Sequence, residues 1–228
     1  MSIEYKIYNT EYRMIDLTKK LDPETETRRL EVRKLFQEKT QDYHSEIDMM
    51  SHLGTHVESP LHCAENLKDV SQLPLDCFIG RGIILNLSQI GPNKSITEED
   101  LDKADNGRTK KGDIVILDSP YQLPPFTDLT NTSVDRRPYV CAETANWLKR
   151  KEVKGVGFSD GVSIEYDVKT IVDFHTILMP LDIIFIEVLK NIELIKTESF
   201  LFCALPLPIS GLDSCPVRAI AIEGILGF

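Results

Sequence analysis

The alternation of short apolar runs with helix-forming segments is the feature that most constrains the fold of this chain. Strand-sized apolar runs occur at residues 82–87, 112–118, 154–158 and 182–187. Helical patterns separate them: one begins with Ser95 or Thr97 as its cap, and two more cover residues 142–150 and 170–178. Strands that alternate with helices predict an α/β domain with a mixed sheet. We expect additional strands at residues 14–18, 199–205 and 217–222.

Length and composition place the chain among ordinary globular proteins. Its 228 residues are 42% hydrophobic and 27% charged, enough to bury a core without a disulfide or a metal. We find no repeat and no proline-rich linker, and we therefore expect one domain over residues 1–228. The 26 basic and 36 acidic residues give a net charge of −10, which argues against binding to nucleic acid or to anionic lipid.

Targeting signals and cysteine usage favour the cytoplasm. No apolar run reaches the roughly 18 residues of a membrane span, and the first residues are too polar for a signal peptide. The cysteines are odd in number and none forms a C-x-x-C pair, which predicts reduced thiols. They are Cys63, Cys77, Cys141, Cys203 and Cys215, of which only Cys63 lies beside the histidine cluster described below.

Two segments are expected on the surface. Residues 22–40 interleave basic and acidic side chains with a loose helical stripe, which predicts a solvated helix or a flap. Residues 119–138 hold four prolines among many Asp, Asn and Thr residues, which is typical of a long loop near the mouth of a site. The apolar tail, residues 220–228, is either an inner strand or a surface that a second copy of the chain could cover.

Three of the five histidines fall within eleven residues. His52, His56 and His62 share this short segment with Glu58. In an extended chain all four side chains point to one face, yet four residues of straight strand span about 13 Å, too far for two ligands of one ion. Gly54 and Ser59–Pro60 are the places where the chain would bend most easily. The segment therefore predicts a kinked strand that brings potential metal ligands together.

Two later residues are weaker candidates. His175 lies in the predicted helix over residues 170–178, and Glu187 ends the apolar run that precedes it. A carboxylate at the end of a buried strand is costly unless it is paired or bound to a metal. Taken alone, each could equally be an ordinary polar residue.

Residues 52–62, His-Leu-Gly-Thr-His-Val-Glu-Ser-Pro-Leu-His, resemble the H-x-G-T-H-x-D-x-P-x-H signature of the cyclase family of metal-dependent hydrolases. That family includes bacterial kynurenine formamidases and isatin hydrolases. Weaker similarities to the family pattern extend along the chain, at residues 15–18, 112–117, 160–163, 204–209 and 214–219. Glu58 stands where the signature has Asp, and the charged segment 22–40 stands where the family's formamidases have a Pro-rich, aromatic stretch.

The resemblance implies a fold, an assembly and a set of site residues. The implied fold is a swivelling β/β/α domain with a compact mixed β core flanked by helices, and the implied assembly is a homodimer or larger. His52, His56 and Glu58 would hold a first divalent ion, which is Zn²⁺ with Mn²⁺ as the alternative. Glu58, His175 and Glu187 would hold a second ion, although the longer Glu58 leaves one ion or two open. His62 matches the family's catalytic histidine, which donates and accepts the proton.

The ligand types predict the chemistry. Imidazole with carboxylate suits Zn²⁺, Mn²⁺ or Fe²⁺, and such an ion activates water toward an amide, formamide or lactam carbonyl. His62 would pass the proton of that water to the leaving nitrogen. We therefore predict a metal-dependent hydrolase of a non-peptide C–N bond in a small molecule. Two alternatives stay open: an arylformamidase acting on N-formylkynurenine, and a catalytically inactive metal-binding sensor or carrier.

Overall fold

A ten-stranded mixed sheet forms the centre of the described part of the molecule. The computed structural model describes residues 2–7, 10–123 and 135–225. The strand order is β1 (Ser2–Ile7), β2 (Thr10–Asp16), β12 (Ile220–Glu223), β10 (Ser199–Cys203), β6 (Ile79–Asn86), β7 (Ile114–Asp118), β8 (Gly155–Ser159), β9 (Ile184–Leu189), β5 (His56–Glu58) and β11 (Ser214–Pro216). Strands β6 to β9 are parallel, and the other pairs are antiparallel.

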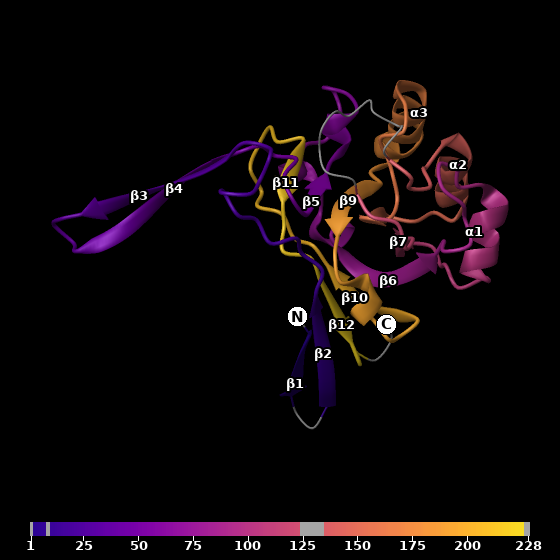
Figure 1. Cartoon of the computed structure of the whole chain (residues 1–228), viewed down its shortest axis with the longest axis horizontal. Coiled ribbons are helices and arrows are strands. Elements are labelled where there is room, and N and C mark those ends of the chain that lie inside the picture. Colours follow the sequence, from indigo (N-terminus) through magenta and orange to yellow (C-terminus); the bar gives the residue numbers. More distant parts are fainter. Residues whose placement is uncertain (1, 8–9, 124–134, 226–228) are drawn as a thin grey trace.

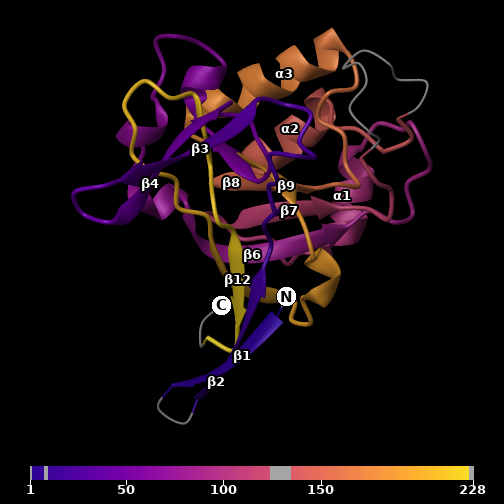
Figure 2. The same ribbon diagram turned by 60° about the vertical axis from the view of Figure 1, so that its left-hand side comes forward.

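Three α-helices connect and cover the parallel strands: α1 (Glu98–Asp105), α2 (Ala142–Arg150) and α3 (Val168–Leu178). They lie together on one side of the sheet in both views (Figures 1 and 2). Helix α2 has the bounds that its sequence pattern predicts. Thr97 caps α1, because its hydroxyl accepts from Asp100 N at 3.2 Å and Asp100 Oδ2 accepts from Thr97 N at 3.0 Å.

The core lies on both faces of the sheet. On the helix side Trp147, Phe158, Phe174 and Phe185 pack with the side chains of β6 and β7. On the other face Ile116, Ile186, Phe200 and Phe202 form a second cluster. Buried side chains alternate between the two faces along each strand, which explains why these strands read as continuous apolar runs. The expected α/β class, with a mixed sheet core and helices beside it, is confirmed.

The segment over residues 22–40 is a projecting ribbon rather than a helix. Strand β3 (Leu30–Gln37) pairs with β4 (Asp42–Met49) in a separate two-stranded sheet. The ribbon extends away from the body, at the left of Figure 1. The flap alternative is confirmed and the helix alternative was wrong. The helix alternative failed because the sequence pattern of one strand does not reveal the partner strand that follows it. Val32 pairs with Ile47 and Phe36 with Tyr43, so one face of the ribbon is apolar.

The start of the apolar tail is an inner strand. Strand β12 lies between β2 and β10, with Ala221 and Glu223 buried. The alternative of a free docking surface is therefore wrong for residues 220–223, and residues 226–228 lie outside the described residues. No helix in the described ranges is both long and apolar enough to cross a membrane.

All five cysteines are free. Cys63 packs against the helix-side core rather than joining the histidines, and burial raises the pKa of its thiol. A raised pKa lowers the thiolate fraction and with it the reactivity of the sulfur.

Candidate metal centre

The histidine segment bends where its sequence predicts. Gly54 has φ +64°, a conformation that favours glycine, and a Cβ there would lie 2.6 Å from Leu21 Cδ2. After this bend β5 lasts only three residues, and Pro60–His62 form a 3₁₀ turn. The bend at Gly54 brings together His52, His56 and Glu58, whose potential ligand atoms all lie within 4.8 Å of one another, and the turn after Glu58 brings His62 to the same cluster.

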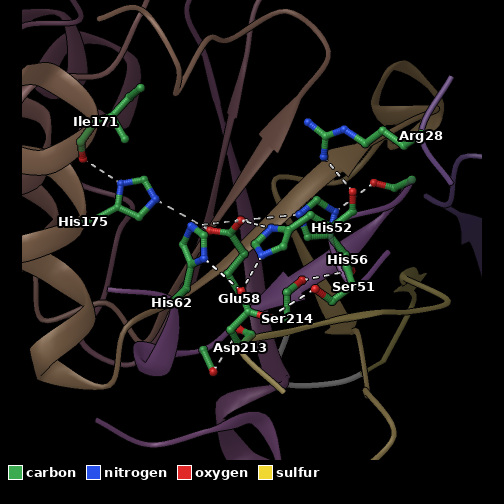
Figure 3. A network of polar contacts seen from close by, with 12 residues as sticks. Arg28, Ser51, His52, His56, Glu58, His62, Ile171, His175, Asp213 and Ser214 are labelled. Atoms are coloured by element: carbon green, nitrogen blue, oxygen red, sulfur yellow. Dashed lines mark hydrogen bonds and ion pairs between the residues drawn. The ribbon is translucent and has the colours of Figure 1, made fainter. Parts of the chain in front are cut away.

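Glu58 lies at the centre of this cluster (Figure 3). Its side chain is buried, and Oε1 is 2.8 Å from His52 Nδ1 and 3.5 Å from His56 Nε2. Oε1 is also 4.0 Å from His62 Nε2, and Oε2 is 3.8 Å from His175 Nε2. Among the described residues, Glu58 Oε2 has no hydrogen-bond partner. A buried carboxylate oxygen without a donor is costly, so the site suits a cation.

Two of the histidines are anchored through backbone carbonyls. His56 Nδ1 lies 3.0 Å from Gly54 O, and His175 Nδ1 lies 2.7 Å from Ile171 O. Because a carbonyl only accepts, both Nδ1 atoms carry the proton and both Nε2 atoms keep a lone pair directed to Glu58. Histidines that bind metals are usually held in this way through their second nitrogen. The donor set therefore fits a divalent ion.

Glu187 approaches the cluster from the neighbouring strand. The register of β5 and β9 pairs it with His56, and it lines the same cavity as Glu58. Burial and the nearby Glu58 carboxylate raise the pKa of Glu187 well above its ordinary value. Burial opposes ionisation of Glu58 as well, but the surrounding imidazoles of His175, His52 and His56 hold its pKa well below the ordinary range. Two adjacent carboxylates, one of which resists ionisation, are an arrangement that a cation would stabilise.

The structure brings the candidate residues together to different degrees. Glu58, His62 and His175 form a second group whose ligand atoms lie within 4.8 Å of one another. Glu187 shares the cavity but belongs to none of these compact groups among the described residues. His44, the one histidine outside the predicted site, lies on the exposed ribbon and pairs with Asp42.

Asp213 is a site residue that the sequence did not reveal. Its Oδ2 lies 2.7 Å from His52 Nε2 and 3.1 Å from His62 Nδ1. It is 161 positions from His52, and no metal-ligand spacing marks it. The available signal is its position directly before residues 214–219, one of the segments that resemble the family pattern.

A cavity of about 330 Å³ opens onto the centre. Its walls are mixed: Phe158, Val162 and Ile164 are apolar, whereas Arg28 and Glu165 are charged. Arg28 Nη1 donates to His52 O at 2.7 Å, so the base of the ribbon borders the site.

The segment over residues 119–138 also borders the site. Leu123 and Arg137, from its two ends, line the cavity, which agrees with the expectation of a loop near the mouth. Residues 124–134 of that segment lie outside the described residues.

Comparisons with known proteins identify the family of this chain. A family model described as "Putative cyclase" matches residues 15–166. The kynurenine formamidase of Bordetella avium is 29% identical over 182 residues, which cover 78% of this chain and 80% of that protein. The kynurenine formamidase of Salinibacter ruber is 28% identical over 174 residues, covering 75% and 76%.

Solved structures share the fold. Isatin hydrolase A of Labrenzia aggregata superimposes with a TM-score of 0.77 at 19% identity, covering 94% of each chain. Isatin hydrolase A of Ralstonia solanacearum gives 0.75 at 18% identity, covering 92% of each chain.

Proposed function

This chain belongs to the Cyclase family, and from that premise we propose that it is a metal-dependent hydrolase of a non-peptide C–N bond in a small molecule. The observation that carries the proposal is Glu58, a buried carboxylate with an unpartnered oxygen, approached by one nitrogen from each of four histidines. Relatives named kynurenine formamidase, which match about three quarters of the chain, support amide-type chemistry.

The metal ligands follow from the arrangement of donors. His52, His56 and Glu58 would hold a first divalent ion, and Glu58, His175 and Glu187 would hold a second if two are bound. Nitrogen and carboxylate donors suit Zn²⁺, with Mn²⁺ as the alternative. The bound ion polarises the substrate carbonyl and lowers the pKa of water.

His62 handles the proton. Its side chain is one-third exposed and lines a second cavity, of about 500 Å³, together with Glu58 and His175; its Nε2 is directed to Glu58 and its Nδ1 is held by Asp213. An imidazole with one nitrogen held and the other open can accept a proton from water and donate it to the leaving nitrogen. The apolar wall of Val162 and Ile164 positions the substrate and excludes water.

The cavity lining bears on the arylformamidase alternative. The segment ahead of the histidines contributes polar residues, Thr25 to Arg28, to the wall. Its aromatic residue, Phe36, lies on the ribbon and does not line the cavity. We therefore propose the broader class of formamides, amides and lactams, with N-formylkynurenine as one member to be tested.

A metal-loaded preparation tests the proposal on a panel that includes N-formylkynurenine, simple formamides and isatin as a lactam. Hydrolysis of N-formylkynurenine, aryl formamides or isatin releases a proton near pH 7, because the acid ionises while the aromatic amine stays neutral, and a pH indicator records it; for alkyl formamides, whose amine takes up that proton, formate is measured instead. We expect metal-dependent acid release on at least one substrate, and loss of both metal and activity in a His52→Ala/His56→Ala double variant. Equal metal content in the two proteins would overturn the metal site. Full metal without turnover on any substrate would favour the sensor or carrier alternative, for which Glu58 in place of Asp is the specific observation.

We also propose that the protein is a cytoplasmic homodimer or larger oligomer. The free cysteines support the location. The apolar face of the ribbon supports the assembly, because Phe36 is 49% exposed, Ile47 61% and Tyr43 73%. An isolated two-stranded ribbon is marginally stable in water, so a second copy that covers this face would stabilise it.

A further inference from the structure

We propose that Asp213 is the positioning residue of the metal centre, a carboxylate outside the ligand set that holds both His52 and His62. The inference rests on the proposed hydrolase function for its kinetic consequence, although its structural consequence can be measured without a substrate. Its premise is the geometry of a single oxygen: Asp213 Oδ2 lies 2.7 Å from His52 Nε2 and 3.1 Å from His62 Nδ1.

Asp213 is itself held firmly. Its Oδ1 accepts from Ser51 Oγ at 3.1 Å, and its main-chain oxygen accepts from Ser59 N at 2.8 Å and Ser59 Oγ at 3.0 Å. The next residue, Ser214, is paired with Glu58 in the β5–β11 ladder. The strand that carries Glu58 therefore also fixes the main chain at Asp213 through backbone pairing.

The four histidines share one pattern with an informative difference. Each directs one nitrogen to Glu58 and anchors the other. His56 and His175 anchor to neutral backbone carbonyls, whereas His52 and His62 anchor to the Asp213 carboxylate. A carbonyl fixes the tautomer of a neutral imidazole, and a carboxylate also stabilises an imidazolium.

That difference matches the proposed work of His62. A histidine that shuttles a proton becomes positively charged in the course of each turnover, so a carboxylate anchor stabilises the state that it has to reach. The same oxygen orients His52 and makes it a more basic metal ligand. Asp213 thus contacts both a proposed metal ligand, His52, and the proposed proton shuttle, His62. A displacement of either imidazole should therefore change the position of the other.

Two substitutions separate the two parts of this role. Asp213→Asn keeps an acceptor oxygen but removes the charge. In the metal-loaded enzyme we expect kcat to fall about 10- to 100-fold, with KM nearly unchanged and full metal occupancy at saturating metal. In a His62→Ala background the same substitution should cost less, because the part of the effect that acts through His62 is gone and only the contact to His52 remains. Glu152→Gln, which removes an exposed carboxylate paired with Lys111 far from the site, is the control for net charge.

Asp213→Ala removes the acceptor and tests the anchor directly. In ¹⁵N NMR spectra of the metal-loaded protein we expect the wild-type His62 ring to carry its proton on Nδ1, and the variant to show a mixture of tautomers. Ser51→Ala, which removes only the hydrogen bond to Asp213 Oδ1, should shift the spectrum in the same direction by less and is a milder variant if Asp213→Ala folds poorly.

The outcomes distinguish this proposal from the proposed function. An unchanged His62 tautomer in Asp213→Ala would overturn the positioning role even if no substrate had been found. Loss of metal from Asp213→Asn at saturating metal would also overturn it, because Asp213 would then be a ligand, as its proximity to His52 and His62 also allows. Equal losses of kcat in the wild-type and His62→Ala backgrounds would show that Asp213 acts independently of His62.

Discussion

Glu58 carries the buried negative charge at the centre of the candidate metal site. It is 4% exposed, yet its surroundings keep it ionised although burial opposes this. One oxygen is close to three histidines and the other has no hydrogen-bond partner within the described residues. A buried carboxylate that has a hydrogen-bonding partner for only one of its two oxygens favours the binding of a cation.

His62→Ala separates a proton shuttle from a ligand. We expect the variant to keep its bound metal and to lose about 10² to 10⁴ in turnover, the usual contribution of general acid–base catalysis. Metal content and rate are measured on one preparation, with His44→Ala as the control because His44 lies on the exposed ribbon. Metal loss together with activity would instead make His62 a ligand.

At the scale of elements, the β3–β4 ribbon is the part of the fold that lacks internal support. One face carries Val32, Phe36, Tyr43 and Ile47, and the Phe36 and Tyr43 rings lie 5.1 Å apart. The opposite face includes charged pairs such as Arg33 and Glu46. One apolar and one charged face are typical of a ribbon that packs on another protein surface on one side only.

Ile47→Glu places a charge on the apolar face and should convert the proposed dimer to a monomer, because a buried unpaired carboxylate is unfavourable. Sedimentation velocity at micromolar concentration measures the change. Leu35→Glu introduces the same charge on the opposite face and should leave the assembly intact. A wild-type protein that sediments as a monomer would refute the dimer itself.

A second prediction at this scale concerns the contact between α1 and α2. Asp105, the last residue of α1, accepts from Lys151 Nζ at 2.7 Å and from Thr109 N at 2.7 Å. Burial alone would raise the pKa of Asp105, but these bonds lower it below its ordinary value. A lowered pKa in the folded state stabilises the protein above the unfolded pKa of about 4, and this contribution is lost as pH falls through the folded pKa.

Asp105→Asn should therefore be less stable than wild type at pH 7. The difference between their free energies of unfolding should narrow on acidification below about pH 4. Urea unfolding at pH 3 to 7 measures both curves. Asp173→Asn, which breaks an exposed pair with Lys169, should run nearly parallel to wild type. A gap for Asp105→Asn that stays constant over this range would contradict the assignment.

At the scale of the whole molecule, the metal centre links distant parts of the sheet. Glu58 lies on β5, Glu187 on β9 and His175 on α3, and Asp213 directly precedes β11. An ion bound to the proposed ligands would thus connect segments that are far apart in sequence. Because it binds only the folded arrangement, it should stabilise the entire fold.

Removal of the metal should lower the melting temperature of the protein. At a free metal concentration 100 times Kd, the loss is about 2.7 kcal/mol, or roughly 5–10 °C for a chain of this length. Differential scanning calorimetry before and after chelation measures it, and restoring Zn²⁺ or Mn²⁺ shows which ion recovers more. The His52→Ala/His56→Ala variant should respond less to either ion, because it lacks two ligands of the first site, and an equal response would place the stabilising ion elsewhere.

Local sequence patterns were sufficient to predict much of the secondary structure of this protein. The strand and helix alternation predicted the strands that form β6 to β9 and the helices between them, because apolar periodicity within a few residues sets which face is buried. The spacing of His52, His56 and Glu58, with breakers between them, predicted a bent strand whose side chains converge. Such short-range geometry is constrained by the backbone itself, and Gly54 adopts the conformation that the spacing required.

Pairing between strands that are far apart in sequence decided the remaining contacts of the site. Strand β5 lies between β9 and β11, which sets Glu187 beside His56 and Asp213 beside His52 and His62. No pattern in the residues around Asp213 indicates this, because the register between strands far apart in sequence depends on how the entire sheet assembles. The ribbon has the same origin: within segment 22–40, residues 30–37 form a strand because residues 42–49 pair with them. The sequence alone determined which residue types could bind a metal, and the tertiary structure decided which acidic residue would hold the histidines in place.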